Sequence, residues 1–156
     1  MSKYALMKDT PSKKIIIYTD GGSRGNPGPA AIGVVIVDTF GNRKKEYGKA
    51  IGVRTNNEAE YEAVCFSLAK AKALVGGKEA KESVVELYVD SELVARQLGG
   101  RYKVEEERLF PYFMKVWNAR IDFKLISFHH VPREKNREAD RLVNEALDQE
   151  AHTLFQ

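Results

Sequence analysis

Residues 15–19 read Ile-Ile-Ile-Tyr-Thr, a run of apolar or β-branched side chains without polar alternation. A strand that is apolar on both faces must be covered by other elements on both faces. The run therefore predicts a central, buried strand in a layered α/β domain. At 156 residues, the chain is long enough for one domain with a substantial core.

The residues after this run predict an antiparallel meander. Residues 21–29 read GGSRGNPGP, which is typical of a loop because it holds four Gly and two Pro. A second strand is expected at about 31–37, followed by a Gly41-Asn42 turn and a third strand near 44–51.

Helices separate the remaining strands. Thr55 and Glu58 form a capping-box pattern, which predicts a helix from there to about Val75, ended by Gly76-Gly77. We expect a strand at 84–89, helices at 91–98 and 105–119, a strand at 123–128, and a last helix. Side chains at helical spacing are expected in the core: Cys65, Phe110, Phe113, Val116 and Trp117, and, in the last helix, Ala139, Leu142, Val143, Ala146 and Leu147. The order predicts an α/β fold with a five-stranded mixed sheet and helices on both faces.

Composition excludes several classes of protein. There is one Cys, which rules out a disulfide framework and fits a reducing cytoplasm. The longest apolar run has eight residues, too few to span a bilayer, and no signal-peptide pattern opens the chain. We expect a flexible arm at 1–13, a catalytic domain at 14–150 and a short tail at 151–156, acting in the cytoplasm. Residues 1–55 carry 10 Lys/Arg against 4 Asp/Glu, which permits a phosphate-facing surface or only scattered solvated charges.

Four carboxylates are notable for their positions. Asp20 and Asp90 each end a predicted strand, and ligands of α/β sheets collect at the carboxyl ends of strands. Glu60 lies in the first turn of the capped helix, and Asp140 lies one turn beyond Asn136. Each also has a local explanation: a turn for Asp20, an N-cap for Asp90, and solvated helix positions for the other two.

If the four carboxylates meet in one crevice, they repel one another unless divalent cations are bound. Oxygen-only ligands favour Mg²⁺ or Mn²⁺ over Zn²⁺, for which the sequence offers no Cys/His cluster.

Several separate motifs occur in order along the chain. They are Tyr18-Thr19-Asp20-Gly21-Gly22-Ser23, Gly25-Asn26-Pro27-Gly28-Pro29, Thr55-Asn56-Asn57-Glu58-Ala59-Glu60, Val89-Asp90-Ser91 and Asn136-Arg137-Glu138-Ala139-Asp140. Together they resemble the type 1 ribonuclease H family over about residues 15–147. The last motif and Val131-Pro132-Arg133 resemble archaeal-type members.

The resemblance implies an endonuclease that cleaves the RNA strand of RNA/DNA hybrids and leaves 5′-phosphate and 3′-hydroxyl ends. It implies two Mg²⁺ ions, replaceable by Mn²⁺, held by Asp20, Glu60, Asp90 and Asp140, with Asp20 bridging both ions. Glu60 and nearby backbone groups would also read 2′-hydroxyls. Cleavage of RNA/RNA duplexes is a further possibility that the sequence leaves open.

The resemblance also implies substrate contacts that position the duplex without reading its sequence. The matching positions are Gly21, Gly22, Asn26, Thr55, Asn56, Asn57 and Ser91. Asn26 and Thr55 have local alternatives, as a loop-shaping residue and as a helix cap.

An auxiliary role before the last carboxylate has two candidates. Many bacterial relatives carry a His in this loop, and counting back from Asp140 assigns the role to His130. The archaeal-type pattern assigns it to Arg133, which we prefer and include among the catalytic residues.

The expected partner is an RNA/DNA hybrid bound by a monomer, with no membrane. A basic handle found in some relatives is absent, because residues 99–104 read only GGRYKV. Lys13, Lys14 and the Arg43-Lys44-Lys45 cluster are candidate phosphate contacts, although we prefer a solvated turn for the cluster. The Leu154-Phe155 end resembles sliding-clamp-binding peptides only in part, because Gln149 is wrongly spaced. A catalytically silent hybrid-binding module is the rival function, but it predicts loss of a carboxylate and all four are present.

Overall fold

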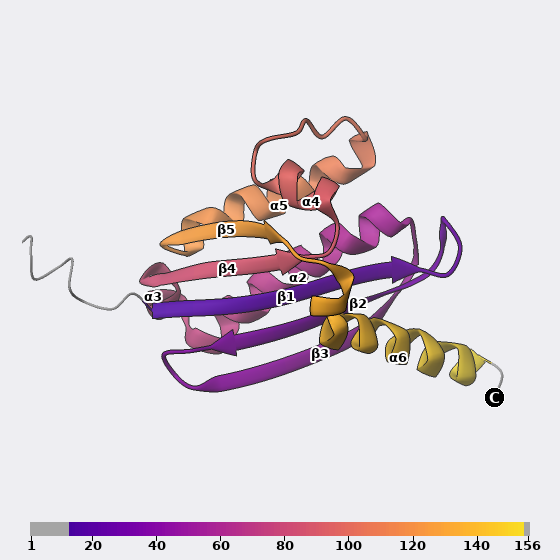
Figure 1. The fold of residues 1–156 in the computed structure, drawn as a ribbon, viewed down its shortest axis with the longest axis horizontal. Coiled ribbons are helices and arrows are strands. Elements are labelled where there is room, and N and C mark those ends of the chain that lie inside the picture. The colour runs from indigo at the N-terminus through magenta and orange to yellow at the C-terminus, as the bar shows by residue number, and fades with distance from the viewer. Residues whose placement is uncertain (1–12, 155–156) are drawn as a thin grey trace, which may run out of the picture.

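The computed structural model describes residues 13–154, and these form a five-stranded mixed sheet in the order β3-β2-β1-β4-β5 (Figure 1). The strands are β1 (Lys13–Ser23), β2 (Gly28–Asp38), β3 (Arg43–Arg54), β4 (Ser83–Val89) and β5 (Leu125–His130). The α-helices are α2 (Asn56–Val75), α3 (Gly77–Lys81), α4 (Glu92–Leu98), α5 (Phe110–Ala119) and α6 (Arg137–Leu154), with short 3₁₀ helices η1 (Glu107–Leu109), η2 (Arg120–Asp122) and η3 (Arg133–Lys135).

Strand β1 is central, as its apolar run predicts. It pairs antiparallel with β2, where Ile17 lies opposite Ile36, and parallel with β4, where Ile17 lies beside Leu87. Parallel pairing of β1 with β4 and of β4 with β5 sends the carboxyl ends of three strands to the same edge of the sheet.

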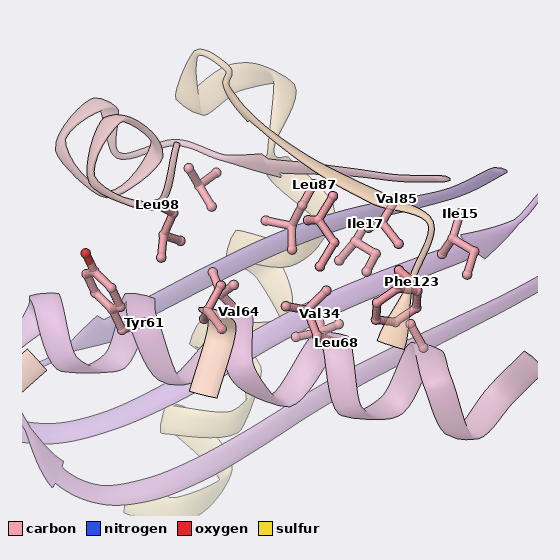
Figure 2. Close-up of a cluster of buried hydrophobic side chains, with 14 of the residues drawn as sticks. Ile15, Ile17, Val34, Tyr61, Val64, Leu68, Val85, Leu87, Leu98 and Phe123 are labelled. Carbon is pink, nitrogen blue, oxygen red and sulfur yellow. The ribbon is translucent and has the colours of Figure 1, made fainter. Parts of the chain in front are cut away.

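Helices cover both faces of the sheet. Helix α2 crosses one face over β1 and β2, accompanied by α4 and α5, and α6 packs on the other face over β2 and β3 (Figure 1). The main core lies between the sheet and α2, where Ile15, Ile17, Val64 and Leu68 are buried (Figure 2). No helix within residues 13–154 combines the length and the apolar character needed to cross a bilayer.

Two glycines allow the helices to touch the sheet backbone. A Cβ on Gly21 would collide with the carbonyl of Ala59 in α2, and a Cβ on Gly33 would collide with the carbonyl of Ala139 in α6. Both close approaches occur next to a carboxylate, Glu60 or Asp140, so these glycines help determine where the two side chains lie.

Several element boundaries differ from those expected. Strand β1 continues through Gly21, Gly22 and Ser23, which were expected in a loop, because they pair with Ala30–Ile32 of β2. Residues 77–81 form the unexpected helix α3, the expected helix at 105–119 becomes η1 plus α5, and β5 covers 125–130 rather than 123–128. These shifts occur where backbone pairing, which local composition does not specify, sets the end of an element.

The chain ends also differ from expectation. Lys13 is the first residue of β1 rather than part of an arm, and residues 151–154 continue α6 rather than forming a tail. Residues 1–12 of the expected arm, and Phe155 and Gln156 of the clamp-like end, lie outside the described residues.

The predicted burial of the aromatic residues in α5 is partly wrong. Val116 is buried, but Phe110 and Trp117 are 46% and 54% exposed. Helix α5 packs against α2 rather than under the sheet, so only one side of it reaches the core. Cys65 is half-buried, and its thiol donates a hydrogen bond to the carbonyl of Tyr112 at 3.4 Å.

Candidate active site

The four predicted carboxylates line a single cleft of about 550 Å³. Asp20 lies near the carboxyl end of β1, and Asp90 directly follows the adjacent parallel strand β4. Glu60 comes from α2 on one face of the sheet, and Asp140 comes from α6 on the other. The convergence depends on the parallel pairing of β1 with β4 and on both helices beginning near the same sheet edge.

The start of α2 is rigidly defined, which places Glu60. The hydroxyl of Thr55 accepts a hydrogen bond from the Glu58 amide at 3.2 Å, and the Glu58 carboxylate accepts one from the Thr55 amide at 3.0 Å. This reciprocal pair is the capping box predicted from the sequence. The contact of α2 with Gly21 then sets Glu60 beside Asp20.

The electrostatics of the cleft disfavour charged carboxylates. Burial, followed by repulsion from Asp90, Asp140 and Glu60, raises the pKa of Asp20 to about 8. Burial and the charge of Asp90 raise the pKa of Glu60 to about 7. Such shifts arise where carboxylates are buried close together and no cation lowers the pKa of either group.

Asn136 links two of the strands that carry the site by hydrogen bonds from its side chain. Its side chain is 2% exposed, and its Nδ2 group donates to the Thr19 carbonyl at 2.9 Å and to Oδ2 of Asp90 at 3.3 Å. It therefore joins the residue before Asp20 to Asp90 and fixes the segment that leads into α6. Asn136 belongs to a motif found in the sequence, but its role was not predicted because it depends on a contact between distant segments.

The donor set of the cleft fits a hard divalent cation. All four side chains offer carboxylate oxygens, the ligands that Mg²⁺ and Mn²⁺ prefer. Within residues 13–154, no group of three or more His, Cys, Asp or Glu side chains is arranged closely enough to hold a metal ion as it stands. The mutual repulsion that raises the pKa values of Asp20 and Glu60 is what a bound cation would relieve.

Five further predicted residues line the cleft: Gly21, Gly22, Asn56, Ser91 and Arg133. Ser91 also caps α4, because its hydroxyl accepts a hydrogen bond from the Val94 amide at 3.2 Å. Arg133 lies in η3 and brings a cation to the cleft, whereas His130 faces a separate groove beside β5.

Three predicted substrate residues, Asn26, Thr55 and Asn57, do not line the cleft. Oδ1 of Asn26 accepts a hydrogen bond from the Asn56 amide at 3.0 Å, and Oδ1 of Asn56 accepts one from the Ser23 amide at 2.9 Å. The Gly/Pro loop is thereby tied to the start of α2. Within the described chain, no hydrogen bond occupies the Nδ2 group of Asn26 or Asn56, so both remain able to donate to a ligand.

Five cleft residues were not predicted as site residues: Ser23, Arg24, Val143, Asn144 and Leu147. The last three follow Asp140 at helical spacings of three, four and seven residues, a signal that could have found them. Arg24 lies in the loop that joins β1 to β2 and pairs with Asp148 of α6.

Four of the five candidate phosphate contacts, Lys13, Lys14, Arg43 and Lys44, already form ion pairs. Lys13 and Lys14 begin β1, opposite the end that carries Asp20, and form ion pairs with Glu82 and Glu86. Arg43 pairs with Asp38 at 2.8 Å. Lys44 pairs with Glu138 at 3.1 Å.

Comparison with known proteins agrees with this architecture. A family described as "Reverse transcriptase-like" matches residues 18–146. The chain is 40% identical over 144 residues to ribonuclease HI of Halobacterium salinarum, covering 92% of this chain and 69% of that protein. It is 39% identical over 141 residues to the bifunctional protein Rv2228c of Mycobacterium tuberculosis, of which it spans only 37%.

A solved structure is similar as well. LC11-RNase H1, crystallised in complex with an RNA/DNA hybrid, superposes with a TM-score of 0.81 at 48% identity, covering 88% of this chain and 99% of that one. The matches in sequence and in fold extend over nearly the whole described chain, including the four carboxylates of the cleft. We conclude that the chain belongs to the type 1 ribonuclease H family.

Proposed function

We propose that this protein is an endonuclease that hydrolyses the RNA strand of RNA/DNA hybrids, leaving 5′-phosphate and 3′-hydroxyl ends. The observation that carries the proposal is the convergence of Asp20, Glu60, Asp90 and Asp140 in one cleft. The complex of the similar LC11-RNase H1 with an RNA/DNA hybrid supports the choice of substrate.

The four carboxylates would hold two Mg²⁺ ions, which Mn²⁺ could replace, with Asp20 shared between them. Bound there, the metal supplies Lewis-acid activation of a water molecule and stabilisation of the leaving 3′ oxygen. The raised pKa values of Asp20 and Glu60 mean that ion binding and loss of protons from these groups are coupled. Asn136 keeps Asp90 oriented throughout, and Arg133 offers positive charge to the phosphate or to the departing product.

Neutral groups would position the hybrid. The Nδ2 groups of Asn26 and Asn56 can donate to sugar or phosphate oxygens, and Thr55 and Asn57 flank Asn56 at the start of α2. Gly21, Gly22 and Ser91 line the cleft where backbone groups and a hydroxyl can meet the RNA sugar. A 2′-hydroxyl near Glu60 would distinguish RNA from DNA. We propose a monomer that acts in the cytoplasm.

Cleavage of one end-labelled RNA strand tests the proposal. The strand is presented alone, with RNA, with DNA, and as a DNA-only analogue, in Mg²⁺, Mn²⁺ or EDTA, with Asp90→Asn as the control. Metal-dependent cuts in the RNA strand of the hybrid, abolished by Asp90→Asn, are expected. Cuts in the RNA/RNA duplex would add that substrate. Hybrid binding without cleavage under either metal would contradict the nuclease and favour a binding module.

A further inference from the structure

A second groove runs along the free edge of the sheet beside the carboxylate cleft. It has a volume of about 460 Å³, with β5 on one side, α4 on the other, and Arg101 and Arg120 among its lining residues. We call it the edge groove. It shares no lining residue with the carboxylate cleft, and the function proposed above does not use it.

The edge groove carries uncompensated positive charge. Arg96 pairs with Glu92, the acidic residue of its lining, at 2.8 Å, so these two charges offset each other. Arg101 and Arg120 form no ion pair with any carboxylate in residues 13–154. His130 adds a further polar group at the carboxyl end of β5. An anionic ligand is therefore favoured.

Aromatic rings accompany these cations. The Arg120 guanidinium lies 4.7 Å from the ring centroid of Trp117, and that of Arg96 lies 5.4 Å from the ring of Tyr102. Trp117 and Tyr102 lie beside the lining of the edge groove and are 54% and 48% exposed, and Trp117 also stacks with Phe113. Cations beside exposed aromatic rings are the combination that single-stranded nucleic acids bind.

Strand β5 is also an edge strand, because it pairs only with β4 (Figure 1). Its outer backbone groups face the edge groove rather than another strand, so they are available to bases or sugars.

The edge groove adjoins the carboxylate cleft directly. Ser91 lines the cleft and the next residue, Glu92, lines the groove. On the other side, His130 lines the groove, and the Val131 amide bonds to the Val89 carbonyl at 2.9 Å just before Asp90. A strand that leaves the cleft across Ser91 enters the groove.

We propose that the edge groove binds single-stranded RNA that continues beyond the paired region of the hybrid, an inference that rests on the proposed function. Arg101 and Arg120 contact its phosphates, while Trp117 and Tyr102 support its bases. A protein without a handle would thus hold hybrids whose RNA extends past the duplex more tightly than blunt ones.

Steady-state cleavage tests this proposal with a blunt hybrid and with hybrids that carry an eight-nucleotide RNA overhang at either the 5′ or the 3′ end. The variants are Arg101→Ala/Arg120→Ala and the charge-matched control Lys78→Ala/Lys81→Ala, which removes two exposed cations of α3. For the wild-type protein, we expect KM several-fold lower with one of the overhangs than with the blunt hybrid. The arginine variant should lose this advantage and cleave the blunt hybrid at an unchanged rate.

Salt dependence provides an independent measurement. Two lost phosphate contacts to a single strand should reduce the slope of log KM against log salt by about 1.4 for the overhang substrate alone. The lysine control should behave as the wild-type protein does.

Three kinetic results would overturn the proposal: no effect of an overhang on the KM of the wild-type protein, equal loss of activity on blunt and overhang substrates in the arginine variant, or the same loss in the lysine control. Competition gives a fourth: an acidic peptide that inhibits cleavage of the overhang substrate as strongly as single-stranded RNA does would also overturn it. The last would assign the groove to a protein ligand. Absence of cleavage of the blunt hybrid by the wild-type protein would instead contradict the proposed function.

Discussion

Asn136 donates a hydrogen bond from Nδ2 to Oδ2 of Asp90 at 3.3 Å, and the same group donates to the carbonyl before Asp20. One buried amide thus links the ends of two parallel strands to the segment that starts α6. The carboxylates come from four elements, so their relative placement depends on such links more than on any single element.

Replacing Asn136 should lower turnover more than substrate binding. Because Asp90 loses its orienting donor, we expect kcat to fall about 10- to 100-fold in Asn136→Ala, with KM changed little. Loss of a buried hydrogen bond should also lower the free energy of unfolding by about 1–3 kcal/mol. Kinetics and urea unfolding measure both, with the exposed Asn118→Ala as a control. An unchanged kcat in a folded Asn136→Ala protein would show that Asp90 needs no such support.

Arg133 and His130 should differ in their effect on catalysis. Arg133 lines the carboxylate cleft, whereas His130 lines the edge groove. We therefore expect Arg133→Ala to lower kcat on a blunt hybrid by about 10-fold or more, and His130→Ala to leave it unchanged. If only the His130 change lowers turnover, the assignment to Arg133 is wrong.

Gly21→Ala should damage both stability and activity. The added methyl group would collide with the carbonyl of Ala59, so α2 would have to move away from β1 and carry Glu60 with it. Overpacking of this kind costs about 1–3 kcal/mol. Thermal unfolding and hybrid cleavage report the two effects. Gly77→Ala is the matched control, because a Cβ there meets no atom within 4 Å; equal effects from both substitutions would argue against the close contact.

Removal of metal should make stability depend on pH through Asp20. Its pKa is raised from 3.8 to about 8 in the folded protein, so the folded state binds the extra proton between these values. The stability contributed by the neutral carboxyl is present below about pH 4 and is lost as the pH rises towards 8. Because a tenfold change in proton affinity corresponds to about 1.4 kcal/mol, the loss of folding free energy is on the order of a few kcal/mol.

The measurement is thermal unfolding in EDTA at pH 5 and pH 8. Asp20→Asn, which stays neutral, should be more stable than the wild-type protein at pH 8 and should gain less advantage at pH 5. Adding Mg²⁺ at pH 8 should stabilise the wild-type protein and have little effect on Asp20→Asn. The exposed Glu150→Gln change serves as the control. A wild-type protein as stable as Asp20→Asn at pH 8 without metal would mean that the carboxylates do not repel one another.

Much of the fold could be predicted because it depends on local patterns. The apolar run at residues 15–19 marked the central strand, and the capping box of Thr55 and Glu58 marked the start of α2. The positions of Asp20 and Asp90 at strand ends were sufficient to suggest a shared cleft, since parallel neighbours end at the same edge. These features are encoded within a few consecutive residues, where hydrophobic periodicity and capping hydrogen bonds act.

Only the tertiary structure decided which distant groups meet. It showed that Asn136 bonds to Asp90, that Gly21 admits α2, and that Arg133 and His130 belong to different grooves. It also showed that Trp117 is exposed, although the helical spacing of this residue had indicated the core, and that Lys13 and Lys14 form ion pairs with carboxylates. Such contacts join residues that are far apart in sequence, and their geometry depends on how helices pack on the sheet, which no local pattern encodes.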